Sequence, residues 1–133
     1  MSSTYRPNFC YDGIVSTVVS KPWGREVIFT SPDSLYTNKL ISINHGCRFS
    51  LQYHNQKTET LTLISGQAEL TLGPDKDHLS TQPMTLFEGV TIKAGEVHRV
   101  AAQTDCQIME ASTPEKGITY RLEDDYNRGN EVK

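Results

Sequence analysis

Residues 46–66, GCRFSLQYHNQKTETLTLISG, decide the fold. Polarity alternates over 48–54, which predicts a β-strand with successive side chains on opposite faces. The two faces of that strand would carry Phe49, Leu51 and Tyr53 on one side, and Arg48, Ser50, Gln52 and His54 on the other. A glutamine and a histidine two positions apart on one face indicate a polar site within a β-rich protein.

Residues 59–73, ETLTLISGQAELTLG, contain two alternating runs joined at Ser65-Gly66, which is typical of a β-hairpin. Similar short runs, separated by turn residues, recur along the chain and none has a helical stripe. The expected strands are 25–30, 36–44, 48–54, 59–65, 67–72, 78–87, 90–93, 96–103, 105–112 and 118–122. Many short strands with almost no helix predict an all-β sandwich, jelly roll or small barrel.

Composition excludes several classes of function. A length of 133 residues predicts one domain, and a net charge of −3 without a basic cluster argues against nucleic-acid binding. No apolar run is long enough to span a membrane, and the first residues do not have the pattern of a signal peptide. The three scattered cysteines predict free thiols in a reducing compartment. We therefore expect a cytoplasmic protein whose partner is a small molecule.

Four residues form a candidate metal site. Gln52 and His54 can converge inside a β-protein, and Glu59 can fold back beside them after a short turn. His98, in the segment IKAGEVHRV, is a more distant candidate. Imidazole nitrogen, carboxylate oxygen and amide oxygen together suit one divalent transition metal such as Zn, Mn, Fe, Co or Ni.

The spacing of these residues resembles the first cupin motif, in the order Gly46, Gln52, His54, Glu59 and Gly66. Glutamine stands where many cupins have histidine. The segment AGEVH at 94–98 is similar to the second cupin motif, although Lys93 precedes it instead of proline. This resemblance implies a single cupin-type jelly-roll β-barrel that holds a metal ion through Gln52, His54, Glu59 and His98.

Within the cupins, the chain is similar to the cupin domain of bifunctional phosphomannose (mannose-6-phosphate) isomerases. The likeness is carried by RFSLQYH at 48–54, KPWG at 21–24 and YRLEDDYNR at 120–128. It implies a cupin domain over 21–128, preceded by an arm or irregular lead-in strand over 1–20 and followed by a polar tail over 129–133. The chain departs from the family pattern at 55–57, where Asn-Gln-Lys replaces a histidine-rich run that ends in arginine, and at Thr60.

The resemblance also suggests residues for catalysis and substrate binding. Lys39 and Glu110 match family positions and are candidates for moving a proton, Lys39 through a lowered pKa. Arg48 and Arg128 are candidates for binding a phosphate or a sugar hydroxyl. The alternatives remain open: a solvated lysine, a partner to a ligand histidine for Glu110, an ion pair at the rim for Arg48, and a solvated tail arginine.

The function that this resemblance implies is metal-dependent aldose–ketose isomerisation of a sugar or sugar phosphate. His54, Glu59 and His98 alone would also suit a non-haem Fe(II) dioxygenase. A non-catalytic module that holds a metal and binds a sugar or nucleotide-sugar is a second alternative. Because exposed sheet edges are covered by pairing, we further expect a homodimer.

Overall fold

The computed structural model describes residues 13–133, which form twelve β-strands joined by turns and loops, without a helix in that range. The strands are β1 (Thr17–Lys21), β2 (Gly24–Ile28), β3 (Thr37–Ile43), β4 (Leu51–His54), β5 (Glu59–Ser65), β6 (Ala68–Gly73), β7 (Ser80–Pro83), β8 (Gly89–Ile92), β9 (Val97–Ala102), β10 (Cys106–Ser112), β11 (Ile118–Glu123) and β12 (Glu131–Val132). Residues 1–12 of the expected arm lie outside the described residues, and β1 follows them.

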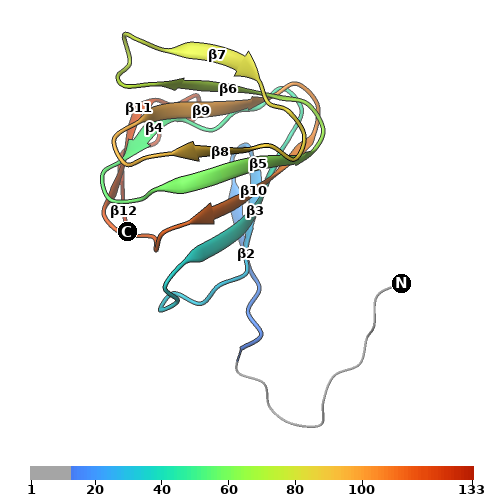
Figure 1. Cartoon of the computed structure of the whole chain (residues 1–133), viewed down its shortest axis with the longest axis vertical. Coiled ribbons are helices and arrows are strands. Elements are labelled where there is room, and N and C mark those ends of the chain that lie inside the picture. The colour runs from blue at the N-terminus through green and yellow to red at the C-terminus, as the bar shows by residue number, and fades with distance from the viewer. Residues whose placement is uncertain (1–12) are drawn as a thin grey trace.

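The strands build two six-stranded sheets, β1-β2-β3-β10-β5-β8 and β12-β11-β4-β9-β6-β7 (Figure 1). The pairing within both sheets is antiparallel, and strands distant in sequence alternate, with β10 between β3 and β5 and β9 between β4 and β6. This order confirms the predicted all-β jelly roll. The hydrogen-bond ladders leave the two sheets with separate edges instead of joining them into one continuous barrel.

Inward-facing positions change from apolar to polar along each central strand. β3 turns inward Ile43, Ile41, Lys39 and Thr37; β5 turns inward Leu63, Leu61 and Glu59; and β10 turns inward Cys106, Ile108, Glu110 and Ser112. The apolar ends pack into one core together with residues of the second sheet. The polar ends are adjacent because Glu110 pairs with Lys39 and Ser112 pairs with Glu59 in the ladders. The functional site therefore lies at one end of the jelly roll.

The strand limits differ from the sequence expectation at three places. The strand expected over 78–87 shortens to β7, and Leu86 and Phe87 lie partly exposed in the loop that follows. β4 begins at Leu51 instead of residue 48, and β12 forms within the expected polar tail by pairing with β11. Alternation in sequence does not reveal these ends, because they depend on where a partner strand is available.

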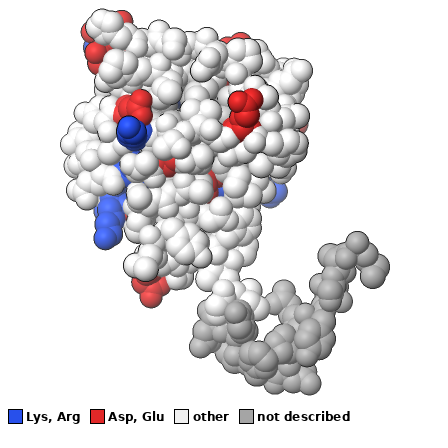
Figure 2. Space-filling view, viewed as in Figure 1, with Lys and Arg blue, Asp and Glu red and all other residues white. Residues whose placement is uncertain are grey.

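On the side drawn in Figure 2, the surface over β3, β10, β5 and β8 is largely uncharged. Cys47 and Cys106 are free thiols, whereas Cys10 lies outside the described residues. Among residues 13–133 we find no helix with the length and apolar character needed to cross a membrane.

Candidate metal centre and its cavity

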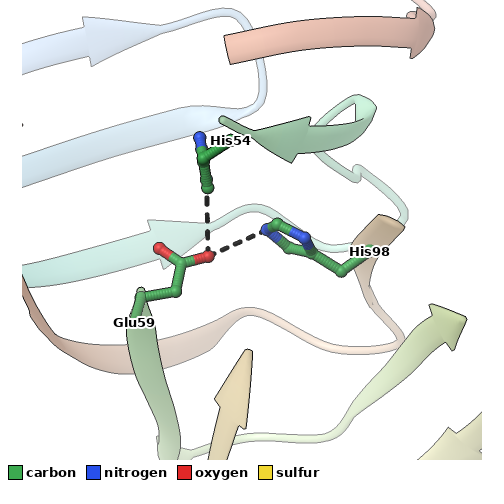
Figure 3. A group of neighbouring side chains, drawn as sticks. All are labelled: His54, Glu59 and His98. Atoms are coloured by element: carbon green, nitrogen blue, oxygen red, sulfur yellow. Dashed lines mark ion pairs between the residues drawn. The ribbon is translucent and has the colours of Figure 1, made fainter. Parts of the chain in front are cut away.

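Two imidazoles and one carboxylate converge where β4 ends, β5 begins in the opposite sheet and β9 runs beside β4 (Figure 3). Oε1 of Glu59 lies 2.8 Å from Nε2 of His98 and 3.5 Å from Nε2 of His54. One potential ligand atom of each residue lies within 4.8 Å of those of the other two, and all three residues are buried. The structure thus brings together three of the four metal ligands expected from the sequence.

The second nitrogen of each ring orients it toward this centre. Nδ1 of His98 lies 3.0 Å from the backbone carbonyl of Glu96, which can only accept, so Nδ1 donates and Nε2 is left facing Glu59. Nδ1 of His54 is hydrogen-bonded to Oγ1 of Thr119 at 2.9 Å. Burial lowers the pKa of His54 and favours its neutral form. Both rings are therefore held as metal-binding histidines usually are.

The contacts at the centre fit a bound cation. The Nε2 atoms of His54 and His98 are buried and have no hydrogen-bond partner among residues 13–133. Nε2 of His98 lies 2.8 Å from Oε1 of Glu59, a distance that needs a proton or a metal ion between the two acceptors. Two nitrogens and one carboxylate oxygen suit a divalent transition metal, so the residues present fit the ion that the sequence predicts.

Gln52 lies beside the three residues. It pairs with His98 in the β4–β9 ladder and lines the cavity, and its Oε1 accepts a 2.6 Å hydrogen bond from Ser50. The remaining lone pair of that oxygen can serve as a weaker ligand than imidazole or carboxylate. The placement agrees with the expected role of Gln52, which stays a prediction.

A bulge before β4 changes one sequence expectation. Arg48 pairs with Ala101 and Gln52 pairs with His98. The segment 48–52 therefore contains one residue more than the segment 98–101 that it pairs with, which defines a β-bulge. The extra residue turns Phe49 inward, where it belongs to the core and lies edge-on to His98. The prediction that Phe49 shares a face with Tyr53 is wrong, because strict alternation cannot anticipate a bulge. Tyr53 stacks outside on Tyr120.

Lys57 is the central cation of the site. Its side chain is 4% exposed, and Nζ lies 3.2 Å from Oε2 of Glu59, 3.3 Å from Oε2 of Glu110 and 3.1 Å from Oε1 of Glu115. Burial alone would lower the pKa of Lys57, but the three carboxylates outweigh it and raise that pKa. Lys57 thus occupies one oxygen of Glu59 and leaves the other oxygen facing the imidazoles.

The carboxylates around Lys57 have different proton affinities. Burial raises the pKa of Glu59, but Lys57 and the two imidazoles outweigh burial and hold it well below its usual range. Burial raises the pKa of Glu110 to about 7, aided by the negative charge of Glu59. Ser112 donates a 2.9 Å hydrogen bond to Oε2 of Glu110. Of these two carboxyl groups, Glu110 is the one that can both take up and release a proton near neutral pH.

Lys39 differs from its expected state. Its Nζ lies 2.5 Å from Glu115 and 3.4 Å from Glu26. Burial lowers the pKa of Lys39, but Glu110, Glu26 and Glu115 together raise it above its ordinary value. The expectation of a lowered pKa is wrong, because the sequence did not reveal these partners. Lys39 is a protonated side chain on the cavity wall.

The candidate metal centre adjoins a cavity of about 260 Å³ between the sheets, which His54 and Glu59 help to line. One wall is apolar and includes Trp23, Phe49 and Leu61. The wall also includes charged groups from both sheets and the C-terminal strand: Lys21, Glu26, Lys39, Lys57, Glu59, Glu110, Glu115, Arg121, Arg128, Glu131 and Lys133. A ligand here can meet an apolar surface, ammonium and guanidinium groups, and the metal ligands at once.

The two arginines expected to bind substrate occupy different places. Arg128 lines the cavity, with its guanidinium bonded to Asp124 at 2.9 and 3.0 Å. Arg48 is not among the lining residues and forms a two-point ion pair with Asp125 at 2.8 and 2.9 Å on the exposed side. The structure therefore places Arg48 in the rim ion pair that was the alternative interpretation.

Sequence reasoning missed seven charged residues that line the cavity, among them Lys57, Arg121 and Glu115. Lys57 was assigned to a turn, although it has the same parity as the inward-facing Glu59, and that parity was the available signal. Arg121 pairs with Gln52 across β4 and β11, so the register of β11 was needed to find it. Glu115 lies in the irregular segment 113–117, where no periodicity applies.

Comparisons with known proteins agree with this fold. The structure resembles CapF, the capsular polysaccharide assembling protein of Staphylococcus aureus, with TM-score 0.67 and 14% identity over 94% of this chain and 32% of CapF. It resembles oxalate decarboxylase of Bacillus subtilis with TM-score 0.68 and 17% identity, covering 80% of this chain and 29% of that one. It also resembles KdgF of Halomonas sp., with TM-score 0.62 and 12% identity over 75% of this chain and 87% of KdgF.

These likenesses establish the jelly roll of the cupins and nothing finer, because the identities are low. The chain spans about a third of the length of CapF and of oxalate decarboxylase. Oxalate decarboxylase is described as having Mn(II) centres, which makes it a metal-binding neighbour of this fold.

Sequence comparison is more specific. A search of curated proteins gives no significant match. The family model described as the C-terminal domain of mannose-6-phosphate isomerase matches residues 5–130, almost the entire chain. The match includes every residue of the metal centre and of the cavity wall except Glu131 and Lys133. The protein therefore belongs to the cupin-type family of mannose-6-phosphate isomerase C-terminal domains.

Proposed function

We propose that the protein is a metal-dependent isomerase that interconverts an aldose and a ketose, with a sugar or sugar phosphate as substrate. The observation that carries this proposal is the position of Glu110 and Lys39 on the wall of the cavity that His54 and Glu59 of the candidate metal centre also line. The family match supports a sugar-phosphate substrate. Fold alone would not distinguish this function from the others that cupins perform.

The reaction moves a proton between neighbouring carbons through an enediol, and each part of it has a candidate side chain. His54, Glu59, His98 and Gln52 would hold the ion, which supplies electrostatic stabilisation of the negative charge that develops on the sugar oxygens. Glu110 takes the proton from one carbon and returns it to the next. Lys39, protonated between its carboxylates, donates hydrogen bonds to sugar oxygens.

The walls of the cavity would position the sugar. Trp23 and Phe49 give an apolar surface for the C–H face of a sugar ring. Arg128 lines the cavity and can hold an anionic group of the substrate. Water exclusion by the surrounding core strengthens these charged contacts.

A turnover assay tests the proposed function. The protein, loaded in turn with Zn²⁺, Mn²⁺, Fe²⁺, Co²⁺ or Ni²⁺, is incubated with mannose 6-phosphate and other aldose phosphates in D₂O. We expect ketose formation with deuterium at the carbon next to the carbonyl. Glu110→Gln should lower kcat by roughly 10²- to 10⁴-fold, because it removes the base, while the metal content stays unchanged. Glu88→Gln, an exposed matched control, should leave kcat at the wild-type value.

Other outcomes of the same assay would contradict the proposal. Oxygen uptake with Fe²⁺ would favour the dioxygenase, for which His54, Glu59 and His98 have the required ligand types. Saturable sugar binding without turnover by any metal form would favour the non-catalytic module. A Glu110→Gln variant with full activity would exclude Glu110 as the base.

We also propose that two copies pair through the uncharged outer face of β3, β10, β5 and β8 (Figure 2). Its outward positions are Asn38, Leu40, Ser42, Gln107, Met109, Ala111, Thr60, Thr62, Ile64, Gly89 and Thr91. Polar groups on this face bond one another, as in the 2.8 Å contact between Thr60 and Thr91, which lowers the cost of removing water. A neutral face meets its own copy without charge repulsion.

The dimer prediction is checked by sedimentation at micromolar concentration. The wild type should have the mass of two chains, and Met109→Lys or Thr62→Lys should convert it to a monomer because each places a charge in the interface. Thr71→Lys, on the outer side of the other sheet, should remain dimeric. A wild-type monomer, or a dimer that both lysine variants leave intact, would contradict this interface.

A further inference from the structure

One carboxylate in the cavity is surrounded by three ammonium groups from three parts of the chain. Oε1 of Glu115 lies 2.5 Å from Nζ of Lys39 and 3.1 Å from Nζ of Lys57, and Oε2 lies 2.7 Å from Nζ of Lys133. Their positive charges hold the pKa of Glu115 far below its usual range, although burial alone would raise it. Lys39 comes from β3, Lys57 from the turn before β5, and Lys133 follows β12.

Glu115 reaches this position from the cavity mouth. Its side chain is 25% exposed, whereas those of Lys39 and Lys57 are 6% and 4% exposed. It belongs to the irregular segment 113–117, and within the described part of the chain residues 114–116 make no backbone–backbone hydrogen bond. Its ion pairs are therefore the strongest contacts that hold the middle of this segment against the cavity. Lys39 and Lys57, by contrast, also pair with other carboxylates, Lys39 with Glu26 and Lys57 with Glu59 and Glu110.

We propose that Lys39, Lys57 and Lys133 form an anion subsite, and that Glu115 fills it until the anionic group of a ligand displaces it. This inference rests on the proposed function, since it gives the substrate of that cavity a phosphate or carboxylate group. A carboxylate within the chain imitates such a group. Three ammonium groups can donate hydrogen bonds to the three terminal oxygens of a phosphate. A single carboxylate has only two oxygens and cannot accept from all of these donors equally well.

Charge predicts which anion displaces Glu115 best. A phosphate dianion carries twice the charge of the carboxylate that it replaces, and interactions with ammonium groups strengthen where water is excluded. A simple carboxylate such as acetate would exchange like for like and gain little. The subsite therefore favours a phosphorylated ligand over one that carries a carboxylate.

The test uses the metal-loaded protein with inorganic phosphate or acetate as the probe, measured by calorimetry. Glu115→Gln removes the competing charge and should tighten phosphate binding by roughly tenfold or more. Acetate binding should tighten less. Lys39→Met added to Glu115→Gln should reverse the gain, because it removes one of the three donors. Glu88→Gln, the exposed control, should bind phosphate as the wild type does.

Unchanged phosphate affinity in a folded Glu115→Gln variant would overturn the subsite, and so would a gain that Lys39→Met does not reverse. A second measurement does not depend on any variant. Phosphate added to the wild type should shift the backbone amide signals of residues 113 and 115–117 together with that of Lys133. Shifts confined to His54, Glu59 and His98 would mean that phosphate binds at the ion alone, which also overturns the proposal.

These readouts separate the subsite from the reaction. Phosphate binding that responds to Glu115→Gln without isomerisation of any sugar would disprove the proposed activity and leave the anion subsite standing. Isomerisation by a protein whose phosphate affinity ignores Glu115 would leave the activity standing and disprove the subsite.

Discussion

Replacing His98 with alanine should eliminate stoichiometric metal binding while the jelly roll stays folded. The His98 side chain is 0% exposed, and its free nitrogen faces the carboxylate of Glu59 at 2.8 Å. Loss of one of two imidazoles should weaken metal affinity by more than about 100-fold, the upper range seen for residues that merely support a ligand. Metal content after dialysis, measured by mass spectrometry, checks this result, and circular dichroism checks the fold.

Matched variants make the result specific. His78→Ala removes an exposed histidine that contacts Asp75, and its metal content should equal that of the wild type. Gln52→Ala should reduce affinity less than His98→Ala, because an amide oxygen is the weaker ligand. Full metal occupancy in His98→Ala would contradict the assignment of the site.

Of the substitutions described here, Lys57→Met should lower the free energy of unfolding the most. Methionine keeps most of the apolar length but removes the ammonium group that lies within 3.3 Å of Glu59, Glu110 and Glu115. Removing one partner from a buried ion pair costs roughly 3–5 kcal/mol of unfolding free energy, since the remaining charges lose their compensation. For a chain of this size, that loss should lower Tm by roughly 10 °C or more.

Thermal unfolding of the metal-loaded proteins tests this expectation. Lys76→Met, at an exposed position, should change Tm by no more than a few degrees. Lys57→Arg keeps the charge and should recover part of the loss, because guanidinium also pairs with carboxylates. A Lys57→Met protein as stable as the wild type would show that the buried charges do not depend on Lys57.

Alternation and spacing were sufficient to locate most of the metal centre. Gln52 and His54 share strand parity, and Glu59 begins the next strand, so local geometry places them at one end of the sheets. His98 was a candidate by residue type, but only the resemblance to the second cupin motif assigned it to this site, because its contact with Glu59 spans distant strands. The exception is Phe49, whose inward position depends on a bulge.

The charges around the centre could not be predicted in the same way. The pKa of Lys39 depends on burial and Glu110, and also on Glu26 and Glu115, which reach it from β2 and from the segment 113–117. A loop side chain has no periodic pattern to indicate its direction. Lys57 has the same strand parity as Glu59, but its place in the expected turn 55–57 concealed this signal. Spacing therefore predicted the candidate metal ligands, whereas the ion pairs around Glu59 and Glu110 required three-dimensional contacts.

The central claim is that His54, Glu59 and His98 bind one divalent ion inside the jelly roll. Anomalous diffraction at the metal absorption edge, from crystals of the metal-loaded wild type, tests it most directly. The account predicts one strong peak between Nε2 of both histidines and Oε1 of Glu59, with bonds of about 2.0–2.2 Å if the ion is Zn²⁺. The absence of a peak there, or a peak held only by surface residues, would contradict the claim.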